Sequence, residues 1–235
     1  DRFGAEQTFE LAAKASQKIE DADARIRATV YLAEQLAPAG KQMEAAELLK
    51  PLATLVEQID SAEVRAGDLA AIAGAQAAAG RIRAAKESTA TAEALVEKVP
   101  DVIGQVLVLG HVAKAYQRMD RADDVQRVMD DALARARAAE EDRARADCIA
   151  LAGFQFHELG DREMAQKILD EAAAASRKID SPHSKAHAMY NVATKLVDTG
   201  HSKKAYALLK EAEAVAESIP DRDLQTQTAE KVRTL

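Results

Sequence analysis

The side chains with the most chemical potential in this sequence are five histidines, one cysteine and many carboxylates. His183 and His187 stand four residues apart, which places two imidazoles on one side of a helix, where they could share a metal ion. The sequence offers them no third ligand, so ordinary solvated histidines are the favoured interpretation. Cys148 adjoins apolar residues, where a thiol acts as a small buried hydrophobe rather than as a nucleophile.

The patterns typical of catalysis and cofactor binding are missing from the sequence. It contains no G-x-G-x-x-G, no P-loop, no HExxH and no nucleophile elbow. The carboxylates are spread over polar helix faces, away from any apolar pocket that would perturb their pKa values. We therefore expect neither an enzyme nor a bound cofactor, and no metal site.

A second set of side chains combines basic, aromatic and amide groups. Its members are His111, Lys114, Arg118, Phe154, His157, His187, Tyr190 and Asn191. Basic groups suit a partner that carries carboxylates, and aromatic rings commonly anchor interfaces. These residues are far apart in the chain, so their meaning depends on the elements that bring them together.

The composition indicates that those elements are helices. Hydrophobic residues make up 48% of the 235 residues, whereas aromatic residues make up 3% and Trp is absent. Ala, Leu, Glu, Lys, Arg and Gln dominate, and all favour helices. The net charge of −7 gives no general affinity for nucleic acid, and no apolar stretch is long enough to insert into a membrane. A single cysteine fits the cytoplasm, which is favoured, and also a bacterial periplasm.

Three columns of residues repeat at a period of 40. The first predicts left-handed turns and holds Gly40, Gly80, Asp120, Gly160 and Gly200. The second is apolar and holds Ile19, Ile59, Val99, Ala139, Ile179 and Ile219. The third predicts helix N-caps and holds Asp21, Ser61, Asp101, Ser181 and Asp221, with Glu141 as the exception. Each 40-residue unit is therefore predicted to form two helices around one turn.

Two residues depart from this pattern. Pro51 lies inside a predicted second helix and is expected to kink it, because proline removes one backbone hydrogen bond. Arg135 falls in a column that otherwise holds Leu55, Leu95, Ala175 and Val215. It is expected to pair with a nearby acid or to extend towards solvent, and to mark a local irregularity.

The columns resemble the tetratricopeptide repeat, whose pattern is W-x2-L-G-x2-Y followed by a small Ala and an F in the second helix. The small residue of the first helix is Ala33, Ala73, Ala113, Gly153 and Ala193. The Y position is Leu36, Gln76, Tyr116, Phe156 and Leu196, and the Ala position is Ala45, Ala85, Val125, Ala165 and Ala205. The unit is 40 residues instead of about 34, so the sequence is similar to the longer-unit members of that family.

This resemblance implies an all-α fold, a right-handed α-α superhelix of five full hairpins between two half repeats. The repeats would span 21–60, 61–100, 101–140, 141–180 and 181–220 of one continuous solenoid. The half repeats would span 1–20, with Ala5, Phe9 and Ala12 in register, and 221–235, which could instead be a capping helix. Phe3 and Phe9 are unlike a polar cap, so the N-terminal half repeat is interpreted as cut from a longer solenoid, with a native cap as the alternative.

The resemblance also implies that the first helix of each hairpin lines a concave groove that holds a protein or peptide segment. In the first two repeats this face presents Tyr31, Glu34, Ala71 and Gly74. The Gly and Ala positions could form a recess for an apolar helix, or they could allow close packing between neighbouring first helices. Arg118 and Glu158 occupy equivalent positions and could pair with each other.

Three functions stay open at this point. The favoured one is a scaffold or adaptor that binds a partner segment in the groove through the residues named above. The second is a regulatory module that senses a small ligand or a peptide. The third is self-assembly, in which exposed half repeats of different copies stack end to end.

Overall fold

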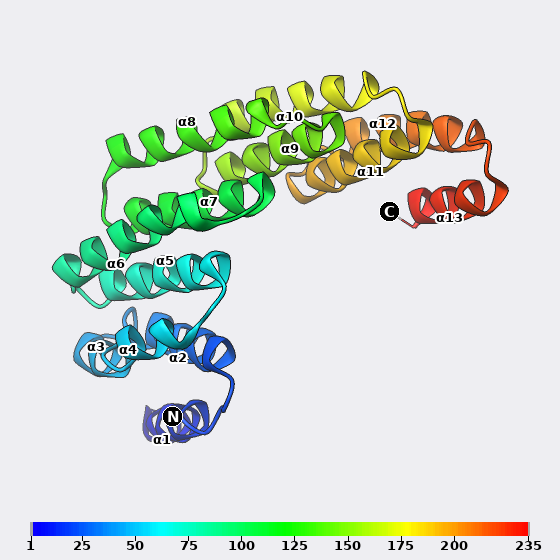
Figure 1. Cartoon of the computed structure of the whole chain (residues 1–235). Coiled ribbons are helices and arrows are strands. Elements are labelled where there is room, and N and C mark those ends of the chain that lie inside the picture. Colours follow the sequence, from blue (N-terminus) through cyan, green and yellow to red (C-terminus); the bar gives the residue numbers. More distant parts are fainter. Residues whose placement is uncertain (1, 235) are drawn as a thin grey trace. The chain divides into compact units, whose positions relative to one another are not determined.

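The computed structural model describes residues 2–234, and their side chains from residue 7 onward. These residues form α-helices and two 3₁₀ turns, with no strand among them (Figure 1). The helices are α1 (Arg2–Ser16), α2 (Ala22–Leu36), α3 (Gln42–Leu49), α4 (Leu52–Leu55), α5 (Ala62–Ala78), α6 (Ile82–Leu95), α7 (Val102–Arg118), α8 (Ala122–Ala138), α9 (Asp142–Glu158), α10 (Arg162–Arg177), α11 (Pro182–Asp198), α12 (Ser202–Glu217) and α13 (Arg222–Arg233). The 3₁₀ turns are η1 (Val56–Gln58) and η2 (Val96–Lys98).

The chain divides into two compact units. Unit 1 comprises Asp1–Pro100 and Val108–Val128, and unit 2 comprises Asp101–Leu107 and Met129–Leu235. Helices α7 and α8 therefore contribute residues to both units.

Side-chain hydrogen bonds cap the N-terminus of most first helices. Asp21, Ser61, Asp101, Ser181 and Asp221 accept hydrogen bonds from backbone N–H groups of the turn that follows. Glu141 makes no such side-chain bond, as expected from its place as the exception. These bonds satisfy donors that a helix start would otherwise leave without partners.

The turn column is confirmed. The backbone angle φ is positive at Gly40, Gly80, Gly160 and Gly200, and Asp120 is the only non-glycine residue in the described chain with a positive φ, at 56°. Left-handed backbone is inexpensive for glycine and tolerable for aspartate. The turn between the two helices of each hairpin therefore follows directly from residue type.

Within unit 1, α2 packs against α3 and α5, and α5 packs against α6. Within unit 2, α9 packs against α10 and α11, and α11 packs against α12 and α13. Figure 1 shows α9, α11 and α13 in one layer of unit 2, with α10 and α12 in the other. The small column of the first helices is fully buried where each hairpin closes, at Ala33, Ala73, Ala113, Gly153 and Ala193. The all-α fold of packed helical hairpins predicted from the sequence is confirmed.

Both predicted irregularities are present. The second helix of the first hairpin breaks at Pro51 into α3 and α4. Arg135 bonds through Nε to Asp131 and through Nη1 to Gln105, each at 3.0 Å. Gln105 stands where Arg25 and Arg145 reach back to carbonyls at the end of the preceding second helix. In the first and fourth hairpins, an arginine of the first helix makes the contact at this junction. In the third hairpin, Arg135 of the second helix makes it by bonding to Gln105.

The predicted N-terminal half repeat rests partly on Ala5, and its interpretation as cut from a longer solenoid rests partly on Phe3. The side chains of both lie outside the described residues, so these interpretations stay predictions.

Candidate functional site

The predicted site residues lie on first helices of both units. The unit 1 face, on α2, α5 and the end of α7, holds Tyr31, Glu34, Ala71, Gly74, His111, Lys114 and Arg118. The unit 2 face, on α9, α11 and α13, holds Phe154, His157, His187, Tyr190 and Asn191. Each face is described separately.

On the unit 1 face, Arg118 crosses α5 and pairs with Glu34 on α2. Its side chain passes directly over Gly74, where a Cβ atom would overlap the guanidinium. The space above Gly74 is therefore filled by a neighbouring first helix rather than left as an open recess. Close packing between first helices, the alternative interpretation of the sequence, accounts for this glycine. Arg118 thus has a partner in Glu34, on a helix two hairpins away.

A buried carboxyl group lies between α2 and α5 at the other end of this face. Asp68 is 5% exposed, its Oδ2 has no hydrogen-bond partner, and the carboxyl of Asp23 lies nearby. Burial and the nearby Asp23 charge raise the pKa of Asp68 to about 7. Asp23 is paired with Arg27 on its own helix.

Two other predicted residues of unit 1, His111 and Tyr31, are both exposed. The His111 ring lies 3.4 Å from the place where a Cβ of Gly67 would be, so this glycine also admits a side chain of α7. Desolvation and then the Lys114 charge lower the pKa of His111. Tyr31 is 62% exposed and extends from α2 into solvent.

On the unit 2 face, the predicted Asn191 belongs to a chain of polar contacts between α9 and α11. Its Nδ2 donates to Asp147 Oδ1 at 3.1 Å, and Arg143 Nε lies 3.7 Å from Asp147 Oδ2. Burial raises the pKa of Asp147, and the bond from Asn191 and the charge of Arg143 act against that rise. Arg143 and Asp147 therefore largely neutralise each other.

His187 and Tyr190 meet Lys231, which extends from α13. Lys231 Nζ lies 3.3 Å from His187 Nδ1 and 5.2 Å from the centre of the Tyr190 ring. The rings of His183 and His187 are 4.5 Å apart, and His183 Nδ1 is 3.1 Å from Thr228 Oγ1. Burial comes first among the causes that lower the pKa of His187 to about 4, followed by Lys231, His183 and Arg143. His187 is therefore neutral at physiological pH, in a positive local field.

The remaining two predicted residues of unit 2 lie further along α9. Lys195 of α11 stands over the ring of Phe154, 4.5 Å from its centre, and also pairs with Asp198 at 3.3 Å. His157 is half-buried, and its Nδ1 is buried without a hydrogen-bond partner. The unit 2 face thus carries two aromatic rings, each half-buried and each beneath a lysine.

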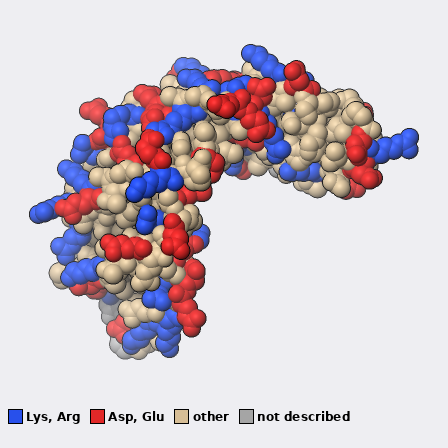
Figure 2. All heavy atoms as spheres, viewed as in Figure 1, with Lys and Arg blue, Asp and Glu red and all other residues tan. Residues whose placement is uncertain are grey.

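The second helices present a different surface. In unit 2, Arg137 pairs with Glu171, Arg177 with Glu211 and Lys204 with Asp170, each pair being 34 residues apart. Acidic and basic side chains are interspersed over the visible surface of both units (Figure 2). The charges of the second helices are therefore largely balanced by their neighbours.

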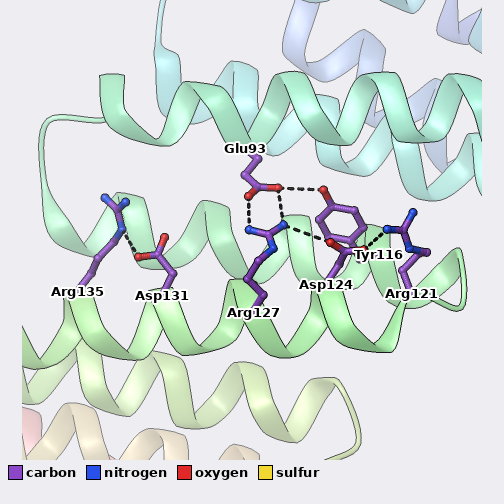
Figure 3. Close-up of polar contacts among 7 residues, drawn as sticks. All are labelled: Glu93, Tyr116, Arg121, Asp124, Arg127, Asp131 and Arg135. Carbon is purple, nitrogen blue, oxygen red and sulfur yellow. Dashed lines mark hydrogen bonds and ion pairs between the residues drawn. The ribbon is translucent and has the colours of Figure 1, made fainter.

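The most extensive polar network of unit 1 lies among α6, α7 and α8 (Figure 3). Arg127 donates to both carboxylate oxygens of Glu93, at 2.6 and 3.2 Å, and the Tyr116 hydroxyl donates to the same carboxylate at 2.9 Å. These bonds lower the pKa of Glu93, whereas burial and the Glu93 bond raise the pKa of Tyr116 to about 12. Asp124 bonds Arg127 at 3.4 Å and pairs with Arg121 at 2.5 Å. These side chains bond to one another across α6, α7 and α8. The network therefore connects the hairpin that contains α6 to the hairpin formed by α7 and α8.

An apolar groove of about 980 Å³ lies on the second-helix side of unit 1, beside α1, α3 and α4. Phe9, Met43, Leu48, Leu52 and Leu55 are among the residues that line it, and none of the predicted site residues does. In the part of the chain that the structure describes, no three His, Cys, Asp or Glu side chains gather as a metal site would require. No helix there has the length and apolarity needed to cross a bilayer.

Two residues that matter to these faces, Lys231 and Asp68, were not predicted from the sequence, and the contact of a third, Asp147, was not predicted either. Lys231 shares a column with Tyr31 and Asn191, and extending the period into the last helix would have found it. Asp68 shares a column with Val108 and Cys148, where a carboxylate is as unusual as Arg135 is in its own column. Asp147 lies on the predicted groove side of α9, but nothing local to it indicated a bond to Asn191.

Comparisons with known proteins give a likeness of fold only. No family model and no curated protein matches the sequence. A putative kinesin light chain with nearly identical TPR-like repeats from Podosopora anserina is 20% identical, covering 85% of this chain and 98% of that one with a TM-score of 0.42. BtubC (BKLC) from P. vanneervenii is 14% identical, covering 89% and 88% with a TM-score of 0.46. Ton1535 from Thermococcus onnurineus NA1 is 14% identical, covering 98% and 85% with a TM-score of 0.40.

Proposed function

We propose that this chain is a protein-interaction domain that holds a segment of a partner protein on the unit 2 face, across α9, α11 and α13. The observation that carries the proposal is the meeting of His187, Tyr190 and Lys231 from two neighbouring helices. An aromatic ring with a cation beside it offers both apolar contact and a charged hydrogen-bond donor, a combination enriched in protein interfaces. The side chains stand on helices, which hold them in place without help from a ligand.

The contrast with the second-helix layer supports the choice of face. Tyr206 on α12 is 64% exposed and has Lys210 over its ring at 5.8 Å, which resembles the pair of Tyr190 and Lys231. Lys210, however, is paired with Glu213 at 3.1 Å. Lys231 has no carboxylate within ion-pair distance among the described residues. Of these two ring and lysine pairs, the one on the unit 2 face is therefore the one whose cation has no acidic partner among the described residues.

The contrast with unit 1 points the same way. There, Arg118 is paired with Glu34, and the glycine floor beneath it is covered by that pair. A partner on this face would first have to displace an existing contact. On the unit 2 face, a partner could bind Lys231 without displacing an acidic side chain.

The chain offers a matched test. A photo-crosslinking amino acid is placed at Tyr190 or Phe154, and in a control protein at Tyr206. We expect a partner protein to be crosslinked from Tyr190 and Phe154 but not from Tyr206. Equal or greater yield from Tyr206 would refute the assignment to the unit 2 face, because exposure alone would then explain the crosslinks.

A further inference from the structure

Three cationic or imidazole side chains from three adjacent helices surround one position on the unit 2 face. Arg143 comes from α9, His187 from α11 and Lys231 from α13, and both Arg143 and Lys231 act on His187 electrostatically. His183 lies one turn before His187, with their ring centres 4.5 Å apart. The charged or titratable groups facing this position are Glu141, Arg143 and Asp147 from α9 and its cap, His183 and His187 from α11, and Lys231 from α13.

The contact between Lys231 and His187 settles where the imidazole proton lies. An ammonium group can only donate, so Nδ1 of His187 accepts and its N–H is on Nε2. The lowered pKa of His187 agrees with a neutral ring beside cations. At neutral pH the position therefore combines one ammonium group, one guanidinium and one imidazole N–H donor.

The groups at this position include two acids, Glu141 and Asp147, and two cations, Arg143 and Lys231. Arg143 is offset by Asp147 at 3.7 Å, whereas Lys231 has no carboxylate within ion-pair distance among the described residues. Lys231 can therefore take one carboxylate of a partner. A phosphate dianion would bring a second negative charge close to the half-buried Asp147, which repels it.

We infer that the Arg143, His187 and Lys231 side chains take a carboxylate of an acidic protein segment, with the Tyr190 ring and the Asn191 amide beside it. This inference rests on the proposed function, since it names the chemistry of the segment held on the same face. The neighbouring ring and amide suit a peptide, and a free small anion would use neither.

The test uses the whole chain and follows the ring resonances of His187 and Tyr190 by NMR at pH 7 and low salt. The probe is acetyl-pentaglutamate amide, with acetyl-pentaglutamine amide as the neutral control. We expect a saturable shift of both rings with the glutamate peptide only. Lys231→Gln should weaken the peptide by about fivefold or more, whereas Lys210→Gln, the equivalent change beside Tyr206, should alter its affinity by less than about twofold. His187→Gln identifies the His187 resonance.

Several results would overturn the inference. No saturable shift at His187, or equal effects of Lys231→Gln and Lys210→Gln, would show that this position does not bind carboxylates. A response to inorganic phosphate without one to the peptide would show a dianion site. Acetate acting as well as the peptide would show a site for free small anions. If Lys231→Gln leaves crosslinking from Tyr190 at full yield, the unit 2 face holds a partner without a carboxylate at Lys231. That result would refute this inference and leave the proposed function unaffected.

Discussion

Replacing Asp68 with Asn is expected to stabilise the protein at alkaline pH and to remove part of its pH dependence. Asp68 lies buried between α2 and α5, with Oδ2 lacking a partner and the carboxyl of Asp23 alongside. Asn has nearly the same shape and stays neutral, so it resembles the protonated acid at every pH.

The magnitude follows from the pKa of Asp68, which rises from 3.8 to about 7 on folding. The folded chain binds this proton more tightly than the unfolded chain does. The associated stability is fully present below about pH 4, falls as the pH rises from 4 to 7, and is lost above 7. A rise of roughly 3 units corresponds to at most about 4 kcal/mol. Asp68→Asn should therefore exceed the natural protein's free energy of unfolding by about 1 kcal/mol near pH 4.5 and by up to about 4 kcal/mol at pH 8.

Histidines act in the opposite direction within the same range. The pKa of His187 is lowered to about 4 and that of His111 is also lowered, so their contributions to stability increase as the pH rises towards the unfolded value. These contributions are common to both proteins and cancel in the difference between the natural chain and Asp68→Asn. That difference is the quantity to plot against pH.

The assay is urea unfolding followed by far-ultraviolet circular dichroism at intervals from pH 4.5 to 8.5. Asp180→Asn serves as the control, because Asp180 is exposed and should give a constant difference. A difference for Asp68→Asn that does not grow with pH would refute the raised pKa of Asp68.

Two further predictions concern packing and the inter-hairpin network. Gly153→Ala should destabilise the protein by about 1–3 kcal/mol in urea unfolding, since its Cβ would lie 3.0 Å from Leu169 and 3.2 Å from Ile168, both buried. In Gly74→Ala the new Cβ would meet only the flexible end of Arg118, so this change should alter stability by less than about 1 kcal/mol. A larger loss of stability in Gly74→Ala than in Gly153→Ala would contradict this packing. Glu93→Gln should destabilise by about 1–2 kcal/mol and lower the Tyr116 pKa from about 12 in an ultraviolet titration, whereas Glu87→Gln, at an exposed pair with Arg83, should do neither. An unchanged phenol titration in Glu93→Gln would show that Glu93 does not control Tyr116.

Features governed by neighbouring residues could be predicted from the sequence. Asp21 and Ser61 act on backbone groups three residues away, Asp120 adopts its own turn, and Pro51 breaks its own helix. In each case the cause and the effect lie within one turn of helix. A periodic pattern therefore located the hairpins and their turns without knowledge of tertiary contacts.

The contacts between hairpins were harder to predict because they depend on side-chain reach. Arg118 and Glu34 are 84 residues apart and meet only because Gly74, on the helix between them, leaves room. Aligning columns suggested a partner for Arg118 in the next hairpin and could not show that a side chain crosses a whole helix. The contact between Lys231 and His187 was not predicted for a related reason. The last helix was interpreted as a half repeat, and the repeat pattern was not extended to its residues on the unit 2 face.

The claim that the unit 2 face holds a partner is tested most directly by the dissociation constant of the partner that crosslinking identifies. The account predicts that Tyr190→Ala weakens this partner by about tenfold or more, while Tyr206→Ala changes its affinity by less than about twofold. An unchanged affinity in Tyr190→Ala, or an equal loss in both variants, would contradict it.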